Sequence, residues 1–126
     1  MKVICLDTDI LQPQVVETEG GLAEWYRLIK CDLIDIVSRK IGGRYYDIIV
    51  DDEGLYKRGG AKPTALDAQQ QPQLVGNLVI CNTDGEGNEA TLTDEDIQHI
   101  LKHIVVLTEA GTDQPQKWLA LNGIEP

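Results

Sequence analysis

The chain has 126 residues and carries 21 acidic against 11 basic side chains, for a formal net charge of −10. Apolar residues make up 42% and charged residues 25%, which is typical of one small globular domain and excludes a disordered, collagen-like or coiled-coil chain. No apolar run reaches the roughly 18–20 residues of a membrane helix, and Asp7 and Asp9 interrupt the N-terminal run before it could act as a secretion signal. We therefore expect a cytoplasmic protein without membrane contacts.

The first thirty residues predict two strands and a helix. Residues 2–6 are apolar and stop at acidic residues, which predicts a strand, and Val15-Val16 would add an edge strand. A helix over roughly 21–30 is predicted by apolar side chains that recur at helical spacing: Leu22, Trp25, Tyr26 and Ile29.

A double glycine, Gly42-Gly43, separates two strand-like runs. Both central positions of a two-residue hairpin turn need a positive φ, so this pair is a strong hairpin signal. The implied register has four opposed pairs: Ile41 with Arg44, Arg39 with Tyr46, Val37 with Ile48, and Ile36 with Ile49.

This register leaves neither face of the hairpin polar. Val37 and Ile48 lie on one face, whereas Ile36 and Ile49 lie on the other. Both faces therefore need a cover. Helices of this chain would supply one, and either other local segments or a partner subunit in a homodimer would supply the second.

The following residues carry weaker signals. We predict a third strand at residues 55–58, one helical turn at 63–67, an exposed connector at 69–72 and a long strand at 74–81, followed by a polar loop at 84–88.

The clearest helix start is at Thr93, whose hydroxyl can cap the free N–H groups of the first turn. Acidic residues follow at the positive end of the helix dipole, and the apolar stripe that begins at Ile97 predicts a helix over about 94–106. The tail, residues 106–126, is apolar enough to dock. Together these elements predict a single α+β domain over residues 1–126, with an antiparallel sheet and about two packed helices.

Three cysteines, Cys5, Cys31 and Cys81, are odd in number and widely spaced. Their spacing does not match that of zinc or redox sites, and Cys5 and Cys81 end apolar runs. We expect them to be small buried core residues.

His99 and His103 stand four residues apart, so they share a helix face with Asp96. Such a set could hold zinc, but this face points away from the apolar stripe and should be an ordinary solvated face. The loop that begins at Asn82 resembles a calcium loop, yet its twelfth position is Thr93 rather than a bidentate glutamate. We therefore expect no metal and no cofactor.

No assembled acid, base and nucleophile is evident. Phosphate-binding glycine loops are absent, Ser38 is the only serine, and the adjacent carboxylates Asp51, Asp52 and Glu53 would point in different directions along a strand. A binding module is therefore expected rather than an enzyme, and a metal-dependent hydrolase is the most distant alternative.

The hairpin offers the best predicted binding surface. Arg39, Arg44, Tyr45 and Tyr46 are residue types favoured at interfaces, and Asp51, Asp52 and Glu53 extend the predicted partner-binding set. The alternative is structural, with the tyrosines covering the sheet and the arginine stems lying over them.

The acidic charge disfavours direct contact with nucleic acid, because carboxylates repel phosphate backbones. It either keeps the protein soluble or docks the protein on a basic partner.

An ordered set of motifs resembles the domain-of-unknown-function family 3846 over about residues 1–105. The motifs are Ile34–Val37, Ile41–Gly43, Tyr46–Leu55, Leu74–Ile80 and Leu92–Ile97. The resemblance implies small proteins of bacteria, especially Firmicutes, and of their phages and mobile elements. It implies no activity, cofactor or catalytic residue.

These observations lead to a functional hypothesis. We expect a non-enzymatic acidic binding protein, acting as a counter-defence inhibitor that occupies a basic host protein which handles nucleic acid. The alternative is a binder of a small molecule such as a signalling nucleotide, through Arg39, Arg44, Tyr45 and Tyr46.

Overall fold

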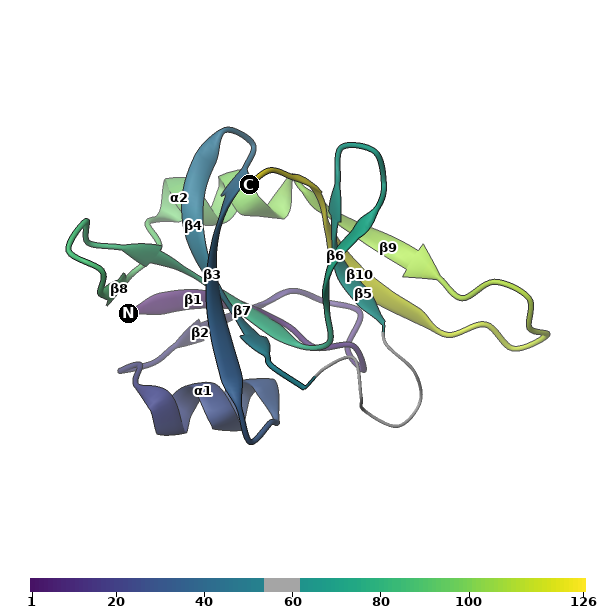
Figure 1. Ribbon diagram of the computed structural model, residues 1–126, viewed down its shortest axis with the longest axis horizontal. Coiled ribbons are helices and arrows are strands. Elements are labelled where there is room, and N and C mark those ends of the chain that lie inside the picture. The colour runs from purple at the N-terminus through teal and green to yellow at the C-terminus, as the bar shows by residue number, and fades with distance from the viewer. Residues whose placement is uncertain (54–61) are drawn as a thin grey trace.

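The computed structural model describes residues 1–53 and 62–126, which form two β-sheets and two helices (Figure 1). This is the expected α+β fold, and most strand pairs are antiparallel. The strand predicted at 55–58 lies outside the described residues.

The first sheet has the strand order β2-β1-β7-β4-β3, and β8 pairs with one end of β7. Its strands are β1 (Lys2–Leu6), β2 (Gln14–Glu17), β3 (Ile34–Ile41), β4 (Arg44–Asp51), β7 (Leu78–Thr83) and β8 (Glu89–Ala90). The predicted strand at 2–6 and the edge strand at Val15-Val16 are thus confirmed.

The β3–β4 hairpin has the predicted register, including the pairs Ile41 with Arg44 and Ile36 with Ile49. Gly42 and Gly43 adopt φ values of 56° and 84°, which such a two-residue turn needs. Both hairpin faces receive apolar cover from this chain, because Ile48 and Ile49 are fully buried in two different clusters.

The second sheet has the order β6-β5-β10-β9 and lies to the right of the first in Figure 1. Its strands are β5 (Pro63–Asp67), β6 (Pro72–Val75), β9 (Ile104–Thr108) and β10 (Lys117–Ile124). The pair of β5 and β10 is parallel, and the other pairs are antiparallel. The predicted docking of the tail therefore takes the form of a strand, β10, that is central to this sheet.

Two predictions about this region were wrong. Residues 63–67 form β5 rather than a helical turn, since they pair with both β6 and β10. The run 74–81 is not one strand, because Gly76, with a φ of 79°, turns the chain so that β6 and β7 belong to different sheets.

Helix α1 (Leu22–Ile29) matches its prediction and buries Trp25 and Ile29. Helix α2 (Asp94–Leu101) begins as predicted, with Thr93 and Asp96 forming a capping box. It ends five residues earlier than predicted, because the β-branched run from Ile104 pairs with β10 as strand β9.

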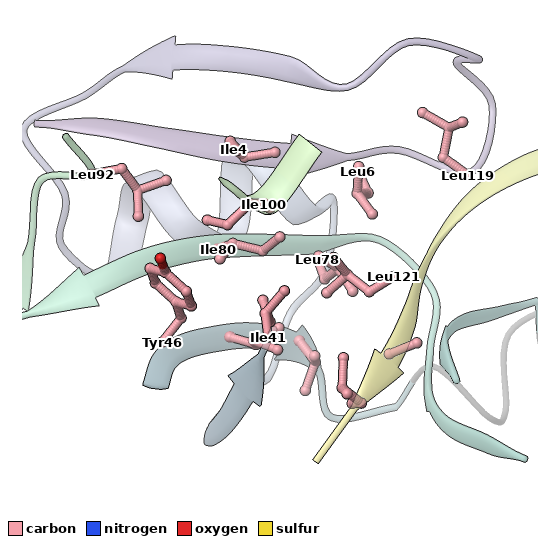
Figure 2. Close-up of a cluster of buried hydrophobic side chains, with 14 of the residues drawn as sticks. Ile4, Leu6, Ile41, Tyr46, Leu78, Ile80, Leu92, Ile100, Leu119 and Leu121 are labelled. Atoms are coloured by element: carbon pink, nitrogen blue, oxygen red, sulfur yellow. The ribbon is translucent and has the colours of Figure 1, made fainter. Parts of the chain in front are cut away.

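The main apolar cluster joins the two sheets and α2 (Figure 2). Its largest side chains come from β1, β3, β4, β7, β10 and α2: Ile4, Leu6, Ile41, Tyr46, Ile48, Leu78, Ile80, Ile100 and Leu121. A second cluster lies under α1 and contains Trp25, Ile29, Ile49 and the three cysteines. The shared main cluster explains why the two sheets hold together.

Candidate functional site

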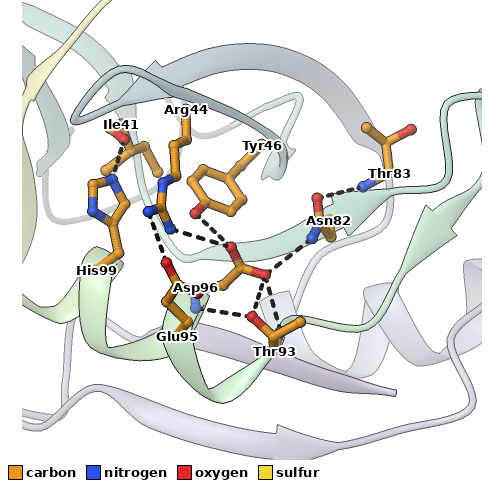
Figure 3. A network of polar contacts seen from close by, with 9 residues as sticks. All are labelled: Ile41, Arg44, Tyr46, Asn82, Thr83, Thr93, Glu95, Asp96 and His99. Carbon is orange, nitrogen blue, oxygen red and sulfur yellow. Dashed lines mark hydrogen bonds and ion pairs between the residues drawn. The ribbon is translucent and has the colours of Figure 1, made fainter.

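The turn end of the hairpin packs against α2 through a polar network (Figure 3). The Asp96 carboxylate accepts hydrogen bonds from the Tyr46 hydroxyl at 2.9 Å and from the Asn82 amide at 3.1 Å. It also accepts bonds from the Thr93 backbone at 3.0 Å and hydroxyl at 2.8 Å. Arg44 completes the network from the rim, 3.9 Å from Asp96.

Asp96 is held ionised by this network. Burial acts to raise the pKa of Asp96, but the hydrogen bonds from Thr93 and Tyr46 and the charge of Arg44 outweigh it and lower the pKa. Burial and the neighbouring Asp96 carboxylate raise the pKa of Tyr46 to about 12. The phenol is thus a fixed hydrogen-bond donor and is unsuited to proton transfer near neutrality.

Tyr46 and Arg44 are therefore occupied inside the chain. Tyr46 is only 1% exposed, so it is a core residue and contributes no surface. Arg44 donates to Glu95 at 2.9 Å, and this ion pair is exposed. For Tyr46, the structural alternative predicted from the sequence therefore holds: its ring covers the sheet and does not form a binding surface.

Tyr45 and Arg39 lie elsewhere. Tyr45 is 53% exposed, with the Lys40 ammonium 5.2 Å from its ring centre, and alternation places it on the face opposite Tyr46. Arg39 lines a hollow of about 510 Å³ together with Asp67 and Glu125. The four cationic and aromatic residues predicted as one surface are consequently divided among three places.

The two histidines are not on a solvated face, contrary to the prediction. Both are half-buried against the hairpin turn, and the His99 Nε2 lies 2.8 Å from the Ile41 carbonyl oxygen. Because a carbonyl only accepts, that nitrogen must carry the proton. The ring of His103 lies 5.3 Å from that of His99, measured between centres. The residues pack where Gly42 leaves space for them, because a Cβ at Gly42 would lie 2.7 Å from His99.

No group of three or more His, Cys, Asp and Glu side chains in the described parts of the chain is arranged to hold a metal ion. In the polar loop, Asp84 accepts from the backbone of Glu86 and from the amide of Asn88. Its carboxylate therefore closes a tight turn between β7 and β8.

The cysteines are buried, as predicted. Burial raises the pKa of Cys5 to about 11 and that of Cys81 to about 12, so both are protonated thiols at neutral pH. Their burial and raised pKa values fit the predicted role as small core residues.

The open end of the hairpin carries the predicted acidic residues. Asp51 is buried and accepts from the Glu53 backbone at 2.9 Å, whereas Asp52 and Glu53 are exposed. Asp51 and Asp52 line a hollow of about 320 Å³ with Asp35. We call this the acidic hollow. Its remaining walls are Val50 and four residues at β6, Pro72, Gln73, Leu74 and Val75.

Sequence reasoning missed Asp35 and the β6 wall. The hairpin register does place Asp35 opposite Val50, next to Asp51, so this carboxylate could have been found. The approach of β6 could not, because it depends on how the two sheets pack.

The fold and site define a two-sheet α+β domain with a cavity lined by carboxylates at one end of a hairpin. The chain belongs to the family Domain of unknown function (DUF3846), whose model matches residues 1–105. The matched region stops before β10. No curated protein and no solved structure matches the chain. Neither described helix is long and apolar enough to cross a membrane.

Proposed function

We propose that this chain is a non-catalytic binding protein that docks its acidic hollow on a basic partner protein. The observation that carries the proposal is the convergence of Asp35, Asp51 and Asp52 on one hollow with an apolar wall. Carboxylates bind guanidinium and ammonium groups, and an apolar wall suits the aliphatic stem of the same side chains. The hollow therefore suits a lysine or arginine side chain of a partner.

The charge of the whole chain supports the same class of partner. A net charge of −10 attracts basic surfaces over distances of about a Debye length and speeds their encounter. Proteins that handle nucleic acid carry basic grooves for the phosphate backbone. We propose that the partner is such a host protein and that this chain acts as a counter-defence inhibitor, in keeping with the phage and mobile-element source that the family resemblance implies.

The state of the reactive residues supports a binding role over catalysis. Cys5 and Cys81 have raised pKa values, and His99 is engaged with a backbone carbonyl. The only serine, Ser38, is on an exposed strand. None of these groups is activated by a neighbouring base in the described structure.

The nucleotide-binding alternative has less support. Arg44 is paired with Glu95 and Asp96, and Arg39 shares its hollow with two carboxylates, Asp67 and Glu125. These acidic neighbours oppose a phosphate. A thermal-shift screen with nucleotides tests the alternative, because a ligand of the folded state raises Tm.

The binding proposal is tested by capture from a host lysate with immobilised wild-type chain and with the double variant Asp35→Asn/Asp52→Asn. We expect the wild type to recover a basic protein that is released by raised salt, and the variant to lose it. The matched control is Glu86→Gln/Asp113→Asn, which removes the same charge from two exposed loop positions. Equal recovery by all three proteins, or no recovery by the wild type, would contradict the proposal.

A further inference from the structure

Among the described strands, β3 is the last of the first sheet, so none of them lies beside one of its edges. Near the hairpin turn this edge is closed by one residue, Glu125. The Lys40 backbone N–H donates to the Glu125 carbonyl at 2.8 Å, and the Glu125 N–H donates back at 3.0 Å. Lys40 therefore points its backbone groups outward, and alternation gives Ser38 and Ile36 the same direction.

Side chains cap two of the four outward groups of Ser38 and Ile36. The Ile36 N–H donates to the carboxylate of Asp35 at 2.9 Å, and the Arg39 guanidinium donates to the Ser38 carbonyl at 2.9 Å. In the described parts of the chain, the Ser38 N–H and the Ile36 carbonyl have no such cap. Within residues 1–53 and 62–126, no strand pairs with the edge beyond the single bridge to Glu125.

A groove runs beside this edge. The acidic hollow and the 510 Å³ hollow share Gln73, so together they extend from Asp35 and Asp52 to Arg39 and Glu125. Strand β6, the edge strand of the second sheet, lines the acidic part of the groove, and Asp35 of β3 lies opposite it together with Val50 and Asp51 of β4. The groove thus offers a hydrogen-bonding edge along one wall and negative charge at its far end.

We propose that an extended basic segment of the partner protein adds to β3 as an antiparallel strand and continues the pairing that Glu125 begins. This inference rests on the proposed function and specifies its binding mode. The added strand accepts a hydrogen bond from the Ser38 N–H and donates one to the Ile36 carbonyl, the two outward groups without a side-chain cap. Its alternate side chains face the groove, where Asp35 and Asp52 receive lysine or arginine. The segment from Ile34 to Ser38 gives room for about five residues, or roughly 17 Å.

A basic occupant fits better than a second copy of this chain. Another copy would bring a net charge of −10 to an edge already flanked by carboxylates. An added strand would also shield the half-exposed side chain of Ile36, which lies on the face away from the groove and is 44% exposed.

The probe for this inference is a six-residue peptide of alternating lysine and valine with acetyl and amide ends. Its alternation places lysine on the groove face and valine beside Ile36. Ser38→Pro removes the outward N–H while leaving the bonds to β4 intact, since proline is tolerated on the open side of edge strands. Ser38→Ala keeps the N–H and is the matched control.

We expect the peptide to bind the wild type and Ser38→Ala with equal affinity by fluorescence anisotropy. Ser38→Pro should bind about tenfold or more weakly, the equivalent of roughly 1.4 kcal/mol for a lost backbone hydrogen bond. Melting curves establish that Ser38→Pro is folded. In the wild type, the peptide should slow hydrogen exchange of the Ser38 amide, a measurement that needs no variant.

Two results would overturn the inference: peptide affinity equal in Ser38→Pro and wild type, or a Ser38 amide that exchanges as fast with peptide as without. Light scattering could also show that the wild type is a dimer and that Ser38→Pro is a monomer. That result would assign the edge to a second copy of the chain and overturn the inference as well. If lysate capture succeeds but any of these contrary results is found, the proposed function holds and only the strand-addition inference fails. If capture fails while the peptide pairs with β3, only the proposed function fails.

Discussion

The two ends of the β3–β4 hairpin treat their charges in opposite ways. At the turn end, Asp96 of α2 is enclosed by hydrogen bonds from Tyr46 and Thr93, and Arg44 is paired. At the open end, Asp35 and Asp52 line a hollow in which no cationic side chain of the described residues takes part. The same sheet thus encloses the carboxylate of Asp96 at one end and exposes the side chains of Asp35 and Asp52 at the other.

This difference separates stability from binding. A polar group that is buried and paired stabilises the fold. Removing it leaves its partner buried without a hydrogen bond, which lowers the free energy of unfolding. Exposed like charges contribute little to stability or oppose it, yet they are available to a ligand. Substitutions at the turn end should therefore change unfolding, and substitutions at the open end should change binding only.

The largest effect is expected for Gly42→Ala. A Cβ there would meet His99 of α2 and His103, which follows the helix, and the φ of 56° is unfavourable for alanine, so the free energy of unfolding should fall by about 2–4 kcal/mol. Gly43→Ala is the control, because it has a positive φ but no atom within 4 Å, and should cost only about 1–2 kcal/mol. Urea unfolding measures both variants. An equal loss of unfolding free energy in the two would show that the space that Gly42 leaves for the histidines does not contribute to stability.

A smaller loss is expected for Tyr46→Phe. The variant keeps the buried ring but removes the bond to Asp96, and should lower the free energy of unfolding by about 1–2 kcal/mol. Tyr45→Phe changes an exposed residue and should stay within about 0.5 kcal/mol of the wild type. If chemical denaturation gives the two variants the same stability, the network around Asp96 does not stabilise the turn end.

The half-buried histidine predicts a modest pH dependence. Burial first, and then the charges of His99 and Lys102, lower the pKa of His103 below its ordinary value of 6.5. A lowered pKa means that the unfolded chain takes up the proton first, so this contribution is complete above pH 6.5 and is lost as the pH falls below it. The urea midpoint should drop between about pH 7.5 and pH 5.5 more in wild type than in His103→Gln. If the urea midpoint drops equally in the wild type and in His103→Gln, the protonation of His103 does not contribute to the pH dependence of stability.

The smallest change in stability is expected at the open end. Asp35→Asn/Asp52→Asn removes two exposed carboxylates, and the free energy of unfolding should stay within about 0.5 kcal/mol of the wild type or rise slightly as repulsion is relieved. The same urea series checks this. A loss of more than about 1 kcal/mol would mean that these carboxylates support the fold, and the contrast between the two ends would not hold.

Local signals predicted the parts of the site that depend on neighbouring residues. The hairpin register followed from Gly42 and Gly43, and the start of α2 followed from the Thr93 capping box. By contrast, residues 63–67 were predicted as a helical turn and residues 104–106 as the end of a helix. Both segments are strands because each pairs with β10. That partner lies far along the chain and beyond the region matched by the family.

The predicted binding set shows the same limit. Tyr46 and Arg44 were grouped with Tyr45 and Arg39 because they are close in sequence, but strand alternation and the docking of α2 separated them. Asp51 and Asp52 were expected to point in different directions along a strand, whereas the structure brings both to one hollow that β6 helps to form.

By itself, the sequence determined the hairpin, its register, the cap of α2, the buried cysteines and the acidic charge, because each depends on the conformational preferences or composition of residues near one another. Only the tertiary structure decided that β6 comes to lie across from the open end of the β3–β4 hairpin, that Tyr46 is enclosed and that Asp35 and Arg39 of β3 line a groove. These features arise where two sheets bury one common core, and the burial of that apolar surface fixes distances between residues that no local pattern relates.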